Sequence, residues 1–412
     1  MTTYAALLKE RYLDPSTVEK LIYPDNPLLG MLEKRGDTGM VGSHLVVPIF
    51  TKNPQGFGGV FATAQTNATA TGSFEFSIDA GSYYGVVNID DKTIAAARTN
   101  TGAFLEHKRQ EIDGLYETGG ENLSLHAWGN GGGALCRLAT LSTNDFTVDK
   151  PEQLANLEID MAVKASANDG SVSTHELRAG TSTTVASLNR ATGAGALTLA
   201  SNITSLAAGD YLFRESDFAG DQSVVVMKGV QCFVTATDAP MALWGISAAD
   251  RALDPQRYAG CRVDPTTLFG KQIDERIKIL MAQMTGRFKA KAPTAGFLHP
   301  EDFQTLDTLM EGKGVRSMED STTKFGYTKI DILTPGGKIP IYLDRHCPKG
   351  TFFAFRLDNW WISSMRELLH PQSGDGNEIL RRDGATDYEF RLLSYPLLAC
   401  NAPKNSGRVS LT

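Results

Sequence analysis

Residues 53–73, NPQGFGGVFATAQTNATATGS, consist almost wholly of glycine, alanine, threonine, asparagine and glutamine. Such small and polar side chains bury too little area to hold a loop against its own domain. The sizeable apolar side chains in this stretch are Phe57, Val60 and Phe61. We therefore expect residues 53–73 to form the tip of a projection, and these three side chains to anchor that tip on another molecule.

Strand-like sequence flanks this tip on both sides. The run LVVPIF precedes it at 45–50, and after it Phe74, Phe76 and Ile78 alternate with polar residues at the period of a strand. We predict a two-stranded hairpin over residues 45–92, roughly 60 Å long at ~3.3 Å per residue. A two-stranded ribbon is marginal on its own in water. It must therefore lie against its own domain or a neighbouring copy, and the polar tip favours the neighbour.

Before the hairpin, residues 1–44 contain short amphipathic helical pieces separated by turns. No piece is long enough to form a core of its own. We predict an arm that lies on another subunit, with Leu28 and Leu29 as candidate contact residues.

After the hairpin, residues 99–128 carry apolar residues at spacings of three and four, which predicts a helix about 40 Å long. Gly119 and Gly120 interrupt it, and each glycine costs a helix about 1 kcal/mol relative to alanine. A glycine pair favours either a bend point or close packing against a neighbouring element. The sequence leaves both interpretations open.

The remainder of the chain has a mixed α+β pattern. Residues 176–230 are Ser/Thr-rich with alternating strands and turns, which predicts a small β-rich insertion. From 266 a helix is expected, with an apolar face that runs from Phe269 to Met284. A short strand then leads into a helix that begins at Pro300, since proline suits the first helical turn.

Composition excludes several classes of protein. The chain has 412 residues, enough for two or three domains, and a net charge of −7 without any basic cluster, so avid binding to nucleic acid is not expected. No apolar run approaches the ~20 residues of a membrane span, and no signal region opens the chain. Five widely spaced cysteines indicate reduced thiols rather than disulfides or a zinc site.

No assembled catalytic motif is present in the sequence. The stretch GNGGGA at 129–134 follows a predicted helix instead of a strand, which argues against a dinucleotide loop. His346 and Cys347 could form a nucleophile–base pair, but neighbours on a strand point to opposite faces. We predict no catalytic, cofactor-binding or metal-binding residues.

Four segments, taken in order, resemble the major capsid proteins of tailed bacteriophages, whose fold also forms the floor of herpesvirus capsids. The first is LWGISAADRALDPQRYAG, and the second pairs LFGKQIDERIKILMAQMTGR with TAGFLHPEDFQTLDTLMEGKG. The third is GKIPIYLDRHCPKGTFFAFRLDNWWISS, and the fourth is YEFRLLSYPLLACNAPKNSGRV. They occupy residues 243–260, 268–287 with 294–314, 337–364 and 388–409.

The resemblance implies an α+β fold with an N-terminal arm, an extended β-hairpin loop, a peripheral domain with a long spine helix, an axial domain and a β-rich insertion on the outer surface. The implied parts are the arm 1–44, the loop 45–92, the peripheral domain 93–175 with spine helix 99–128, the insertion 176–230, the peripheral domain continued 231–265, the axial domain 266–385 and the closing peripheral strand 386–412.

The same resemblance implies a structural role. Subunits would form hexamers and pentamers of an icosahedral shell that encloses double-stranded DNA, assembled in the host cytoplasm and kept in the virion. Implied partners are other copies, a scaffolding protein, a portal and a decoration protein, with non-specific proximity to DNA and no membrane. The alternatives are a tail tube or decoration protein, or a cytosolic hydrolase.

Overall fold

A computed structural model gives the structure of the chain as two compact units, residues 1–121 with 233–412 and residues 122–232. The first 21 residues of the predicted arm lie outside the described part. The structure describes residues 22–36, 39–89, 101–142, 144–171, 177–178, 182–191, 193, 195–218, 226–237, 242–313, 318–320, 327–372, 379–381 and 388–411.

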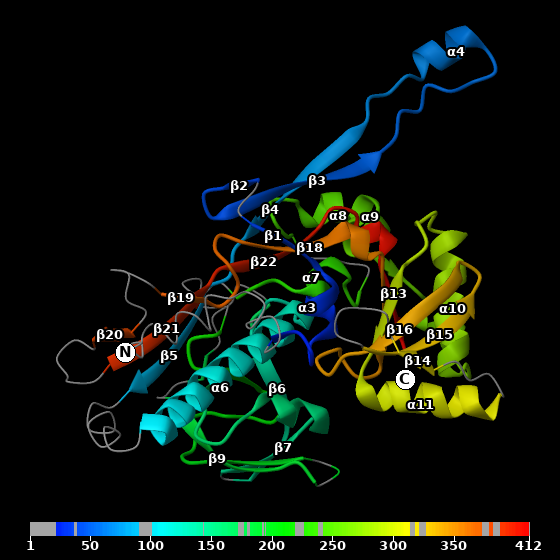
Figure 1. The fold of residues 1–412 in the computed structure, drawn as a ribbon. Coiled ribbons are helices and arrows are strands. Elements are labelled where there is room, and N and C mark those ends of the chain that lie inside the picture. Colours follow the sequence, from blue (N-terminus) through cyan, green and yellow to red (C-terminus); the bar gives the residue numbers. More distant parts are fainter. Residues whose placement is uncertain are drawn as a thin grey trace. The chain divides into compact units, whose positions relative to one another are not determined.

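The first unit contains a seven-stranded mixed sheet in the order β12-β23-β17-β13-β16-β15-β14. Strands β13 to β16 are labelled in Figure 1. The final strand of the chain pairs inside this sheet, so the predicted closing stretch 386–412 shares a sheet with strands of 266–385. The strands are β12 Cys261–Arg262, β13 Ala295–Leu298, β14 Met318–Asp320, β15 Thr328–Thr334, β16 Gly337–Leu343, β17 Thr351–Phe355 and β23 Gly407–Ser410.

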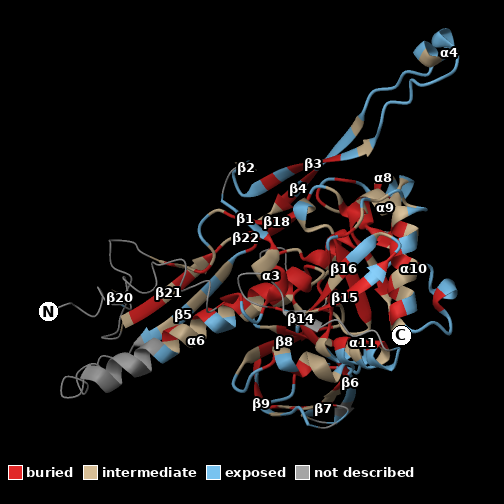
Figure 2. Cartoon of the chain, turned by 45° about the vertical axis from the view of Figure 1, so that its right-hand side comes forward, coloured by how far each residue is buried: buried red, intermediate tan, exposed pale blue. Residues whose placement is uncertain are grey.

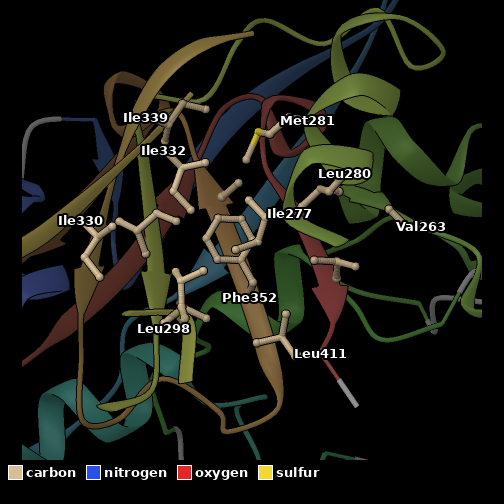
Figure 3. Packing of buried hydrophobic residues seen from close by; sticks show 14 of the residues in the cluster. Val263, Ile277, Leu280, Met281, Leu298, Ile330, Ile332, Ile339, Phe352 and Leu411 are labelled. Carbon is tan, nitrogen blue, oxygen red and sulfur yellow. The ribbon is translucent and has the colours of Figure 1, made fainter. Parts of the chain in front are cut away.

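Helices α10 (Ile273–Thr285) and α11 (Pro300–Gly312) pack against this sheet. The two helices and one face of the sheet share a hydrophobic core. In Figure 3, Ile277 and Leu280 of α10 lie over Phe352 of β17. On the adjacent β13, a Cβ added at Gly296 would lie 2.6 Å from the Phe352 ring, so only glycine fits there.

Helix α10 starts later than the sequence pattern predicts. Residues Pro265–Leu268 form a separate 3-10 turn, and Gly270 then takes a φ of +69°, a conformation that ends the turn. Phe269 therefore does not belong to the apolar face of the helix. Its side chain is 92% exposed.

The predicted hairpin is present, in a shorter form. Strand β3 (His44–Lys52) pairs antiparallel with β4 (Gly72–Asp79), β2 (Met40–Val41) extends the pair, and the tip carries a short helix, α4 (Phe61–Thr66). Burial alternates along β3, as the colours of Figure 2 show.

The predicted end of the hairpin at residue 92 is wrong. Strand β5 (Tyr83–Ile89) pairs with β21 (Tyr388–Ser394) in another sheet, beside β19 (His370–Pro371) and β20 (Ile379–Arg381). The run after Ile78 has strand character, but its partner lies about 300 residues away in the chain.

The long helix predicted at 99–128 is confirmed as α6, Thr101–Trp128. Leu115 lies under Gly85 of β5, and the Tyr116 ring centroid is 6.4 Å from that of Phe390 on β21. A three-stranded sheet and short helices complete the first unit. These are β1 Glu33–Arg35, β18 Trp360–Ser364, β22 Pro396–Cys400, α3 Pro27–Met31, α8 Ala248–Leu253 and α9 Pro255–Ala259, with α7 Val230–Phe233 at the join between the units.

The second unit is a closed six-stranded barrel in the order β10-β7-β6-β11-β8-β9, with its own hydrophobic core. The predicted start of the β-rich insertion at 176 is wrong, because three strands before it belong to the barrel. The strands are β6 Ala134–Ser142, β7 Asp145–Val148, β8 Ala162–Ser166, β9 Thr183–Asn189, β10 Ala196–Leu199 and β11 Tyr211–Arg214.

The chain enters and leaves this barrel unit through a tightly packed neck. A Cβ at Gly132 would lie 1.9 Å from the carbonyl oxygen of Asp169, and one at Gly229 would lie 2.2 Å from that of His126. The Gln231 amide donates to the Gly129 carbonyl at 3.3 Å. The glycine-rich stretch GNGGGA therefore brings the incoming and outgoing segments together, and is not a phosphate-binding loop.

Candidate assembly surfaces

The tip of the hairpin exposes the three apolar side chains that the sequence singles out. Phe57 is 96% exposed, Val60 63% and Phe61 77%. None of residues 50–72 is buried, and residues 53–71 carry no charged side chain. The tip holds its shape through internal bonds, since the Gln55 amide donates to Thr69 Oγ1 at 3.0 Å and the Ala64 amide to the Val60 carbonyl at 3.0 Å.

The base of the hairpin, in contrast, is fixed to its own chain. Phe76 is fully buried, and its ring centroid lies 5.0 Å from that of Trp244 and 6.2 Å from that of Phe233. Phe74 meets Tyr258 edge-on at 6.0 Å. A projection with a rigid base and a bare apolar tip can present a fixed surface to a second molecule.

Leu28 and Leu29, the predicted contact residues of the arm, are only 2% exposed within their own chain. The prediction that they contact another subunit is therefore wrong. The segment is also hydrogen-bonded in place, because the Leu28 amide donates to Asp344 Oδ2 at 3.1 Å and the Tyr327 hydroxyl donates to the Tyr23 carbonyl at 2.8 Å. Short helical pieces that cannot form a core can still cover one.

The glycine pair of α6 has close neighbours on other elements of its unit. A Cβ at Gly119 would lie 3.0 Å from the Leu369 methyl groups, and one at Gly120 would lie 3.0 Å from Ile22 Cγ2 and 3.3 Å from Ile22 Cα. These distances favour the packing interpretation of the pair. The bend at Gly119 and Gly120 stays a prediction.

Alanine substitutions in α6 test the packing interpretation. Gly114 has nothing within 4 Å of an added Cβ, so Gly114→Ala should raise the free energy of unfolding by about 1 kcal/mol. Gly120→Ala should lower it by about 1–3 kcal/mol, because the buried Ile22 cannot move aside. Urea unfolding of the unassembled subunit measures both values. Equal stabilisation by the two variants would exclude the packing role.

The surroundings of His346 and Cys347 do not favour a nucleophile–base pair. Cys347 is buried, and burial raises the pKa of its thiol well above the ordinary value, with Asp344 and Asp302 acting in the same direction. The thiol therefore stays protonated and is a poor nucleophile. All five cysteines are buried and free.

Two further observations concern the described part of the chain only. No three His, Cys, Asp or Glu side chains within it gather closely enough to hold a metal ion. No helix within it is both long and apolar enough to span a membrane.

An ion cluster with a buried carboxylate and two half-exposed lysines joins α10 to the end of α11. Asp274 of α10 is nearly inaccessible, and its Oδ2 accepts from Lys313 Nζ at 2.7 Å and from Lys278 Nζ at 3.3 Å. Burial by itself would raise the pKa of the Asp274 carboxyl, but the two ammonium groups outweigh it and hold that pKa below its usual value. The cluster ties the end of α11 to the first turns of α10.

Comparison with solved structures identifies the fold of the chain. No protein family model matches the chain, and no curated protein matches it. Among solved structures, a chain of the cyanophage A-1(L) capsid asymmetric unit matches with a TM-score of 0.53 and 11% identity, over 95% of this chain and 93% of that one. The chain has a phage capsid fold.

Two further solved structures match with lower TM-scores. A chain of the native GTA particle capsid matches at a TM-score of 0.43 and 6% identity, over 95% of this chain and 91% of that one. A chain from Mycobacterium phage Ogopogo matches at a TM-score of 0.42 and 8% identity, over 94% of this chain and 92% of that one. At these identities no side-chain role can be transferred, so contact surfaces of the phage capsid fold must be argued from this chain's own residues.

Proposed function

We propose that this chain is the major capsid protein of a tailed bacteriophage, a shell-building subunit and not an enzyme. The observation that carries the proposal is the hairpin tip, which projects three large apolar side chains and buries none of them in its own chain. An exposed apolar group of this kind marks a surface that another molecule covers. The phage capsid fold supports a second copy as that molecule.

In this role, subunits form hexamers and pentamers that tile an icosahedral shell around double-stranded DNA. Each hairpin lies on a neighbouring copy, and burial of one phenylalanine or valine there contributes about 1.5–3 kcal/mol. A single contact of this size is weak, but symmetry repeats it at every subunit.

Further partners follow from the same role. A scaffolding protein and a portal would take part in assembly in the host cytoplasm, a decoration protein could bind the finished shell, and the product would be the virion. The net charge of −7 favours loose proximity to packaged DNA over tight binding. No cofactor or metal is required.

Assembly of the purified protein tests this proposal. We expect light scattering to detect large particles or capsomer-sized rings, and negative-stain electron microscopy to image closed shells. Open tubes would favour the tail-tube alternative. A small monodisperse oligomer under all assembly conditions, with or without hydrolytic activity, would reject the proposal.

A further inference from the structure

Phe269 is an exposed aromatic side chain on a firmly held turn. The preceding Leu268 is buried in the core under α10, and the following Gly270 takes a φ of +69°. Leu268 therefore anchors the turn from within, while Phe269 stands 92% exposed above it. A large apolar side chain at this exposure gains nothing for its own subunit.

Hydrogen bonds fix the turn that carries Phe269. Asp264 Oδ1 accepts from the Thr266 amide at 2.9 Å and from its hydroxyl at 2.7 Å. The Thr267 hydroxyl donates to the Asp264 carbonyl at 2.7 Å, and the Lys271 amide donates to the Leu268 carbonyl at 3.1 Å. Because the turn is already ordered, little conformational entropy is lost when a partner binds the ring.

An open surface cavity with mixed polar and apolar walls lies elsewhere on the same unit. Its volume of about 370 Å³ is large enough for one aromatic ring. Phe269 cannot already occupy it, since its side chain is exposed. The apolar and aromatic part of the lining comprises Pro24, Pro27, Pro300, Tyr327 and Leu343.

One charged side chain near the ring and one in the cavity have opposite signs. Lys271, two residues after Phe269, is exposed, and the exposed Asp25 lines the cavity. Arg345 also lines the cavity, but its guanidinium is bonded to Glu121 at 2.6 Å. If the Phe269 ring enters the cavity, Lys271 is brought towards Asp25.

We infer that Phe269 of one copy inserts into the cavity lined by Pro24, Pro300 and Tyr327 of the next copy. The inference rests on the proposed self-assembly and names a contact for it. Ring and cavity are different surfaces of one chain, so each copy gives one contact and receives one. Head-to-tail contacts of this kind close into a ring when the rotation between copies is right. The contact therefore serves the capsomer, separately from the hairpin tip.

Disulfide trapping between copies tests the contact. Phe269→Cys and Thr328→Cys place thiols on the exposed turn and on the cavity wall, and the five native cysteines are buried, so background is low. Chains carrying one substitution each are co-assembled and oxidised. A covalent dimer that appears on a non-reducing gel in the mixture, and in neither variant oxidised alone, joins position 269 of one copy to position 328 of another. The double variant should give a ladder up to the hexamer.

The control replaces Phe269→Cys with Leu253→Cys, another highly exposed apolar position that should give no mixed dimer with Thr328→Cys. Particles that form normally without the Phe269–Thr328 dimer overturn this contact and leave the proposed function standing. An unmodified chain that never assembles overturns both.

A charge exchange gives a second readout that needs no cysteine. Lys271→Glu and Asp25→Lys should each raise the concentration for half-assembly about fivefold, the size of a rim ion pair, and the double variant should restore it. Additive loss in the double variant would overturn the pairing of these two surfaces.

Discussion

Replacing Phe57, Val60 and Phe61 together with serine is expected to leave a folded subunit that no longer forms shells. The three side chains are exposed in the subunit, so their loss should change the free energy of unfolding by no more than about 0.5 kcal/mol. In a shell their combined burial would contribute roughly 4–9 kcal/mol per hairpin. Sedimentation and electron microscopy measure assembly, and urea unfolding of the subunit measures stability.

A matched triple variant separates this effect from general loss of surface hydrophobicity. Leu253, Leu333 and Ile159 are also exposed apolar residues, and none lies on the hairpin. Their replacement with serine should leave assembly close to normal. Shells of normal yield from the tip variant would exclude the tip as an anchor.

Phe352→Ala is expected to lower the free energy of unfolding by about 3–5 kcal/mol, a large part of the stability of a typical domain. Its ring is fully buried between the seven-stranded sheet and α10. The ring packs so closely on Gly296 that a Cβ added there would lie 2.6 Å from it. Phe269→Ala makes the same chemical change at an exposed site and should cost almost nothing. Similar losses from both variants in urea unfolding would show that the core is misassigned.

Local patterns predicted single helices and strands, and the pairing of strands that follow each other in the sequence. The hairpin β3–β4, the helix at Thr101–Trp128 and the strand that leads into α11 at Pro300 all followed from periodicity and turn chemistry. The sequence also predicted that the hairpin tip is exposed, because small polar side chains cannot pack inward.

Long-range pairing and packing were beyond such patterns. Strand β5 has the same residue pattern as the hairpin strands. It lies in another sheet because it pairs with β21, which the pattern cannot reveal. Leu28 and Leu29 form a short apolar stripe that could cover any core, and the structure shows that it covers its own. Phe269 continued the helical spacing, and the turn at Gly270 broke it.

The neck of the barrel unit places the two ends of about a hundred residues within hydrogen-bonding reach of each other. A segment joined in this way can be exchanged for another without stretching the flanking chain, provided the replacement also has adjacent termini. Residues 134–227 thus form a natural cassette, and a short glycine linker between Gly133 and Lys228 is the obvious minimal replacement. In a shell, such a position would offer one attachment point for foreign cargo on every subunit.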